Sequence, residues 1–148
     1  MFSFHLAIVL VLARFCGVVC GICVPRAENV TNLSPASDPV APDSFYVRWP
    51  TSLPESYEEL VLEVVRDWSP LGVDRFYQLI LDNYYDCNGF YRVVDDFVVQ
   101  WGIAAMPNET IKWNTTIPDD PVVESNMFGY VSFATDGPNT RPADLFIN

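Results

Sequence analysis

The chain has 148 residues, half of them hydrophobic, which is enough for one domain with its own core. It carries 8 Lys and Arg residues against 19 Asp and Glu residues, so its net charge is -11. Such a surface repels the phosphates of nucleic acids and of anionic membranes, and we expect no nucleic-acid partner.

The histidine and cysteine content excludes sites that depend on a His base or on His ligands for zinc. The single histidine, His5, lies in an apolar N-terminal segment, so the rest of the chain offers no His base and no His ligand for zinc. We expect neither a metal nor a cofactor. Three cysteines (Cys16, Cys20 and Cys23) share this segment. Cys87 is therefore predicted to be a small, partly buried residue without an internal disulfide, and a reactive thiol is the alternative.

The N-terminal segment itself is typical of a leader. Residues 2–24 are almost wholly apolar, and we predict that residues 1–24 form a secretory signal peptide, with small residues near 21–23 at a suitable cleavage point. An uncleaved membrane anchor is the alternative, although Arg14 would then cost about 2.5–3.5 kcal/mol near the bilayer centre. The expected location is the secretory pathway, either secreted or in the endoplasmic-reticulum lumen. With an uncleaved leader the protein is instead anchored to the membrane by a single span.

The next segment has the composition of a linker. Residues 25–44 contain four prolines among Asn, Ser, Ala and Asp, a mixture that buries little surface. Candidate N-glycosylation sequons occur at Asn29, Asn32, Asn108 and Asn114. Four sequons behind a leader agree with passage through a glycosylating compartment.

A single domain is predicted over residues 45–148. Its first clear strand is Leu60–Val65, an apolar run rich in β-branched residues. Signals for a helix follow directly. Ser69 can cap it, Pro70 suits the first helical position, and Asp74 lies near the positive end of the helix dipole.

Apolar residues at helical spacing predict the buried face of this helix. Val73, Phe76, Tyr77 and Ile80 fall at i, i+3, i+4 and i+7, and the helix should end before the turn-like cluster Asp86–Gly89. Aromatic and β-branched content then predicts four β segments: Phe90–Val94, Phe97–Ile103, Tyr130–Ala134 and Leu145–Ile147. One helix among many short strands predicts a mainly β fold, a barrel or sandwich with the helix covering an opening.

Two pairs of neighbouring acids raise the question of a hydrolase. Glycoside hydrolysis needs two carboxyl groups that face each other across about 5–10 Å. Asp95–Asp96 and Asp119–Asp120 are instead neighbours in the sequence. Because Asp favours turns, we interpret both pairs as turn residues.

Two stretches of the domain carry motifs with fixed internal spacing. Residues 90–102 read FYRVVDDFVVQWG, and residues 129–148 contain GYVSFA, then GPNT, then LFIN. They resemble the cyclophilin patterns F-x-R-[VI]-[IV]-x-x-F-x-x-Q-x-G, G-x-[VIL]-S-[MF]-A, G-P-N-T and F-[FI]-[IN]. Trp68–Val73 with Phe76 is similar to the family's helix-opening pattern. Together the matches cover residues 45–148 in the family's order.

The resemblance implies an antiparallel cyclophilin-like β-barrel capped by a helix, with its active site in a groove on the outer face. Cyclophilins continue for several tens of residues beyond the position matched by Asn148, so we expect the barrel to be incomplete at the C-terminus. Asp144 stands where the family commonly has Gln. We expect that a carboxylate there can pair with Arg92 and hold its guanidinium away from the substrate.

The resemblance also implies an activity, peptidyl-prolyl cis-trans isomerisation, which assists protein folding. Arg92 matches the catalytic position, and the positions that match substrate contacts are Phe97, Val98, Gln100, Ala134, Thr135, Asp144 and Phe146. The expected partners are proline-containing polypeptide clients, and the expected state is a monomer that contacts a membrane only through an uncleaved leader. The alternative is a catalytically weak or inactive module that binds proline peptides.

Overall fold

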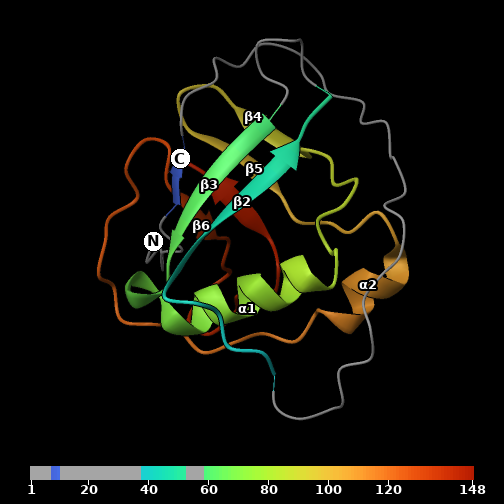
Figure 1. The fold of residues 1–148 in the computed structure, drawn as a ribbon. Helices are drawn as coiled ribbons and strands as arrows, with labels where there is room; N and C mark the ends of the chain where they lie inside the picture. The colour runs from blue at the N-terminus through green and yellow to red at the C-terminus, as the bar shows by residue number, and fades with distance from the viewer. Residues whose placement is uncertain (1–7, 11–37, 53–58) are drawn as a thin grey trace.

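The structure is a computed structural model that describes residues 8–10, 38–52 and 59–148 (Figure 1). In chain order its elements are β1 (Ile8–Leu10), β2 (Ser44–Pro50), β3 (Glu59–Val65), the 3-10 turn η2 (Arg66–Trp68), α1 (Pro70–Leu81), β4 (Arg92–Val94), β5 (Val98–Trp101), α2 (Pro107–Lys112), β6 (Val131–Phe133) and β7 (Leu145–Ile147). Neither α-helix in this part of the chain is long and apolar enough to cross a bilayer.

The fold is mainly β, as predicted. One sheet has three strands in the order β1-β3-β2, the other has four in the order β4-β5-β7-β6, and all pairings are antiparallel. The predicted strands at 60–65 and 145–147 are confirmed, and β4, β5 and β6 are shorter than their predicted segments. Among the described strands, backbone pairing does not close the two sheets into a barrel.

Besides β1 and the short η2, the strand β2 and the helix α2 were not predicted. β2 pairs with β3 along its whole length, and in β2 only every second side chain, those of Phe45, Val47 and Trp49, packs into the core. The expectation of a single helix is wrong, because α2 forms a second, short one. It has no buried residue, so no apolar face marks it in the sequence.

The N-terminal predictions fall mostly outside the described residues. This applies to the leader except for 8–10, to the linker as far as residue 37, and to the sequons at Asn29 and Asn32. Within the predicted leader, β1 pairs with β3. The sequon residues Asn108 and Asn114 lie in and just after α2, and both are exposed.

Helix α1 crosses beneath the strands and closes one end of the core (Figure 1). The predicted residues Val73 and Phe76 are fully buried, while Tyr77 and Ile80 are half-buried and pack against the same core. Leu79, which the i, i+3, i+4 pattern omitted, is also fully buried. The helix therefore presents a wider apolar face than its sequence spacing predicted.

One tryptophan joins the two sheets to this helix. The Trp49 ring of β2 lies edge-on to three rings, with centroid distances of 6.0 Å to Phe76, 5.4 Å to Tyr85 and 5.7 Å to Trp101 of β5. Edge-to-face pairs of this kind are worth about 0.5–1.5 kcal/mol each beyond the area they bury. The cluster holds β5 against the core, and β4 is held in turn by its pairing with β5.

The start of α1 is capped differently from the prediction. Ser69 occupies the N-cap position but makes no side-chain cap hydrogen bond; its hydroxyl donates to Asp120 Oδ2 at 2.7 Å. The Asp120 carboxylate caps the helix instead, accepting from Leu71 N and Gly72 N at 2.9 Å each. Asp74, expected near the positive end of the helix dipole, lies just beyond the first turn and forms an ion pair with Arg66 at 2.8 Å. The cap comes from some fifty residues away along the chain.

A buried arginine completes this junction. The Arg141 side chain is fully buried, and its guanidinium lies 3.1 Å from Asp120 Oδ2 and 3.3 Å from Asp119 Oδ1, while Nη2 also donates to the Pro118 carbonyl. Burial disfavours the charged Asp120 carboxylate, but its hydrogen bonds outweigh that effect and keep its pKa below the usual value. Asp119 and Asp120 are therefore structural, but neither lies in a turn, so the interpretation of this pair as turn residues is wrong.

Cys87 is disulfide-bonded, which corrects the prediction of a lone thiol. It sits in the turn after α1 with a φ of +59°, in the left-handed region.

Candidate active site

Three neighbouring strands place the predicted site residues on one face of the four-stranded sheet. Arg92 of β4 is directly opposite Gln100 of β5, and Gln100 is directly opposite Phe146 of β7. Directly opposite residues project from the same face of a sheet. Arg92, Gln100 and Phe146 therefore form a row across β4, β5 and β7.

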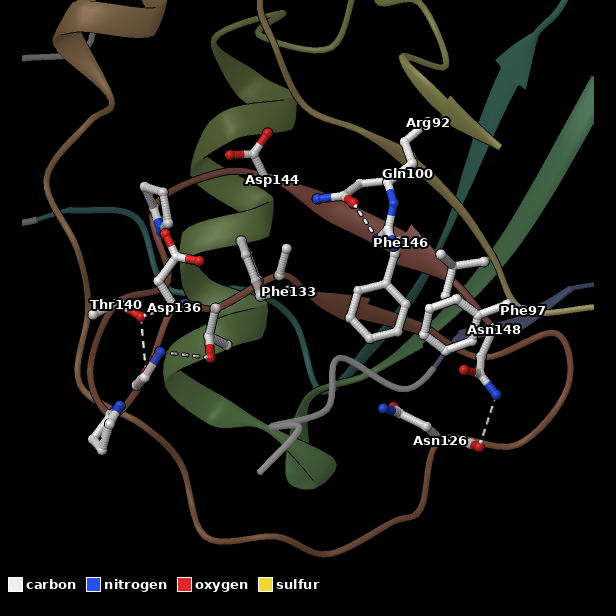
Figure 2. A pocket seen from close by; sticks show the side chains of 16 residues that line it. Arg92, Phe97, Gln100, Asn126, Phe133, Asp136, Thr140, Asp144, Phe146 and Asn148 are labelled. Atoms are coloured by element: carbon white, nitrogen blue, oxygen red, sulfur yellow. Dashed lines mark hydrogen bonds between the residues drawn. The ribbon is translucent and has the colours of Figure 1, made fainter. Parts of the chain in front are cut away.

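The other face of these strands belongs to the core. Trp101, Leu145 and Ile147 alternate with the row and are buried. Because side chains in a strand alternate between faces, the row must point away from the core. It borders a pocket of about 770 Å³ on the outer surface of the sheet (Figure 2).

Arg92 is exposed and loosely held. Its Nη1 donates to Gln100 Oε1 at 3.3 Å, and its guanidinium carbon lies 5.7 Å from the centre of the Phe97 ring. Arginine has five N–H donors in a planar fork. In the described part of the chain Arg92 makes no ion pair within 4.0 Å, so most of these donors remain available to a ligand.

The β4–β5 hairpin places an aromatic ring beside this arginine. Asp95, Asp96 and Phe97 form its turn, and Asp96 has a φ of +53°, a left-handed conformation that Asp adopts more readily than most residues. This confirms Asp95–Asp96 as turn residues. The turn leaves the Phe97 ring 48% exposed at the pocket, whereas Val98 is buried at its base with 6% exposed.

The expected pairing of Asp144 with Arg92 does not form. Asp144 Oδ1 instead accepts a hydrogen bond from the Tyr91 hydroxyl at 3.2 Å. Burial raises the pKa of Asp144, and the negative charge of Asp136 raises it further, although Tyr91 partly offsets both. Burial and the Asp144 charge also raise the pKa of Tyr91 to about 12. Asp144 therefore leaves the guanidinium free to act on a ligand.

A loop between β6 and β7 forms the opposite wall. Its Ala134 N donates to the Asp144 carbonyl at 2.8 Å, extending the β6–β7 ladder. Thr140 Oγ1 accepts from Asp136 N at 2.9 Å and donates to the Gly137 carbonyl at 2.8 Å, so the loop is tied to itself (Figure 2). These bonds hold Ala134 and Thr135 along the edge of the pocket, where an extended peptide can lie.

The structure brings all eight predicted site residues to this one pocket. It adds eight residues that were not predicted: Asn126, Phe133, Asp136, Gly137, Pro138, Thr140, Pro142 and Asn148. Most of these lie within the matched motifs, which could have identified them. Asn126, Asp136 and Pro142 lie outside the motifs, and only the fold places them here.

Comparison with known proteins agrees with this geometry. The profile of the family described as cyclophilin type peptidyl-prolyl cis-trans isomerase/CLD matches residues 51–148. The chain is 33% identical over 98 residues to "Peptidyl-prolyl cis-trans isomerase-like 3" of Neurospora crassa, covering 60% of this chain and 59% of that protein. It is 32% identical over 102 residues to "Peptidyl-prolyl cis-trans isomerase ppi1" of Schizosaccharomyces pombe, covering 64% of each. The chain thus spans less than two thirds of these relatives' lengths.

Proposed function

This chain belongs to the cyclophilin-type peptidyl-prolyl cis-trans isomerase family, and from that premise we propose that it catalyses rotation about Xaa-Pro bonds in polypeptide clients. One observation carries the proposal. Arg92, with donors to spare, lies at an outward-facing pocket beside the exposed Phe97 ring and in the same row as Phe146. The alternating side-chain pattern of the strands produces this arrangement directly.

The reaction breaks no covalent bond, so the protein must lower a rotational barrier. That barrier is about 18–20 kcal/mol, and the free reaction takes tens of seconds or longer. Twisting the amide removes its resonance and returns a lone pair to the prolyl nitrogen. A donor aimed at this nitrogen stabilises the twisted state more than either planar state. The permanent charge of Arg92 suits that role at any physiological pH.

The free energy of a single hydrogen bond limits the rate enhancement that Arg92 can supply alone. A hydrogen bond to a charged group is worth about 1.5–3 kcal/mol, and each 1.36 kcal/mol removed from the barrier is tenfold in rate. Arg92 thus accounts for about one to two powers of ten. An apolar surface helps further, because the amide loses charge separation as it twists. We assign that surface to Phe97, Val98 and Phe146, and the orientation of Arg92 to Gln100.

Two further features of the prediction belong to this proposal. We propose that the two sheets are parts of a cyclophilin-type barrel, which the proximity of β1 to β6 and the shared core support. We also propose that the protein works in the secretory pathway. Exposed sequons at Asn108 and Asn114 and a disulfide-bonded Cys87 support an oxidising, glycosylating compartment.

The test is isomerisation of a short Xaa-Pro peptide by the full chain and by Arg92→Ala. We expect kcat/KM to fall about 10- to 100-fold, because the donor to the prolyl nitrogen is lost. Arg48→Ala is the matched control, since Arg48 is an exposed strand arginine paired with Glu59 outside the pocket. Equal rates for wild type and Arg92→Ala would refute the assignment of Arg92.

A proline-peptide binding module is the second candidate. The observation that favours it is the Asp144 carboxylate, which brings a negative charge into the pocket that contains Arg92. Binding of a proline peptide without any rate enhancement would establish this function in place of the first.

A further inference from the structure

The pocket has an acidic side that rotation about a prolyl bond does not use. Among the described residues that line it, Arg92, Asp136 and Asp144 carry charge. Figure 2 shows the two carboxylates on one side of the pocket and the rings of Phe97 and Phe146 on the other. The aromatic side suits a proline ring, which leaves the acidic side to a neighbouring residue of the bound chain.

Neither carboxylate has a cationic partner in the described part of the chain. No Lys or Arg nitrogen lies within 4.0 Å of Asp136 or Asp144. Asp144 accepts a hydrogen bond from Tyr91, a neutral donor, and Asp136 is exposed. Both acids line the same pocket, and the negative charge of Asp136 contributes to the raised pKa of Asp144. Two like charges without a counter-ion favour a cation placed between them.

Asp144 directly precedes β7 and continues its pairing with the β6 side through the Ala134 N–H, so the spacing of this segment indicates where the cation would lie. Phe146 and Asp144 are two residues apart, and two steps of an extended chain span about 7 Å. A peptide lying extended along the pocket has the same step length. With a proline ring against Phe146, the side chain of a residue one or two positions away reaches Asp144 and Asp136.

We propose that this pocket selects proline segments with a Lys or Arg residue within two positions of the proline. The proposal rests on the proposed function, because that function places the proline ring against Phe97 and Phe146. Asp136 and Asp144 act as specificity-determining residues. They recognise the cation and take no part in the twisting of the amide.

The test compares peptides of the form Xaa-Ala-Pro-Phe, Ala-Xaa-Pro-Phe and Ala-Pro-Xaa-Phe, with Lys, Ala or Glu at Xaa. For each we would measure kcat/KM by proton exchange spectroscopy and Kd by calorimetry with the full chain. We expect Lys to exceed Glu about three- to tenfold in at least one register, because an exposed ion pair contributes only a fraction of a kcal/mol to about 1 kcal/mol. Asp136→Asn should reduce that ratio about twofold or more.

The control separates the local effect from the overall charge of -11, which attracts any cationic peptide. Asp86→Asn makes the same charge change at an exposed turn outside the pocket, and we expect it to leave the Lys-to-Glu ratio unchanged. An equal drop in Asp86→Asn and Asp136→Asn would overturn the proposal.

The outcomes also distinguish this proposal from the proposed function. If the chain catalyses isomerisation but shows no preference among Lys, Ala and Glu in any register, the proposed selectivity is overturned. The proposed isomerase activity is supported by that same result. Tighter binding of Lys peptides without catalysis supports the selectivity and refutes the isomerase.

Discussion

Replacing Asp120 by alanine should remove a large part of the free energy of unfolding, although this residue does not line the pocket. Its buried carboxylate accepts two helix N–H groups and the Ser69 hydroxyl, and it pairs with the fully buried Arg141. Loss of a helix cap costs about 0.5–2 kcal/mol. Removing one member of a buried ion pair costs about 3–5 kcal/mol. Asp119 still contacts Arg141 at 3.3 Å, which favours the lower end of that range.

We therefore expect Asp120→Ala to lower the free energy of unfolding by about 3.5–5 kcal/mol, out of the 5–15 kcal/mol typical of a domain. The assay is urea unfolding followed by tryptophan fluorescence, with the exposed Asp86→Ala as the control. A loss below about 1 kcal/mol would refute the reasoning, because it would mean that the cap and the ion pair are redundant.

The pH dependence provides a second check on the same carboxylate. Because the pKa of folded Asp120 is lowered, its contribution is present above the unfolded value of about 3.9 and is lost as the pH falls through the folded pKa. The gap in stability between wild type and Asp120→Asn should therefore narrow below about pH 4. A gap that stays constant to pH 2 would contradict the lowered pKa.

Two further predictions concern the pocket. In Gly102→Ala the new Cβ would lie 2.5 Å from the Asp144 Cα, at a φ of +132°. We expect this variant to lose about 1–3 kcal/mol of stability in urea unfolding and to lose activity in the peptide assay. Gly89→Ala is the control, because a Cβ there meets open space, and it should be neutral in both assays. Asp144→Gln should change kcat/KM by less than about threefold, because Asp144 is not paired with Arg92. A tenfold rise would favour the binding module instead. The same variant should lower the pKa of Tyr91 from about 12 in an ultraviolet titration, but not to 10, because burial is its first cause.

The residues that the resemblance assigned to a site meet at one pocket, whereas parts of the surrounding fold were missed. Arg92, Gln100 and Phe146 were identified from motif spacing, and the strand register then explains why they meet. Strand Leu145–Ile147 and the start of α1 at Pro70 followed from local signals, since β-branched content and proline geometry act within a few residues.

What was missed depends on contacts between distant parts of the chain. The sequence around Ser69 does not reveal that its hydroxyl donates to Asp120 or that Asp120 caps the helix, because the two residues are about fifty positions apart. Asp136 joins the pocket only because the β6–β7 loop folds back through Thr140. Helix α2 is 6 residues long and has no buried residue, so its sequence carries no apolar periodicity from which a helix could be predicted.

Arg141 has a consequence that reaches from the helix cap to the binding surface. Its guanidinium carbon lies 5.9 Å from the centre of the Phe133 ring, which borders the pocket. Its Nη2 forms an ion pair with the Asp120 carboxylate, which caps α1. One buried side chain therefore contacts both a residue that lines the pocket and the carboxylate that accepts from the amides of Leu71 and Gly72, so the helix start and this part of the pocket share a common support.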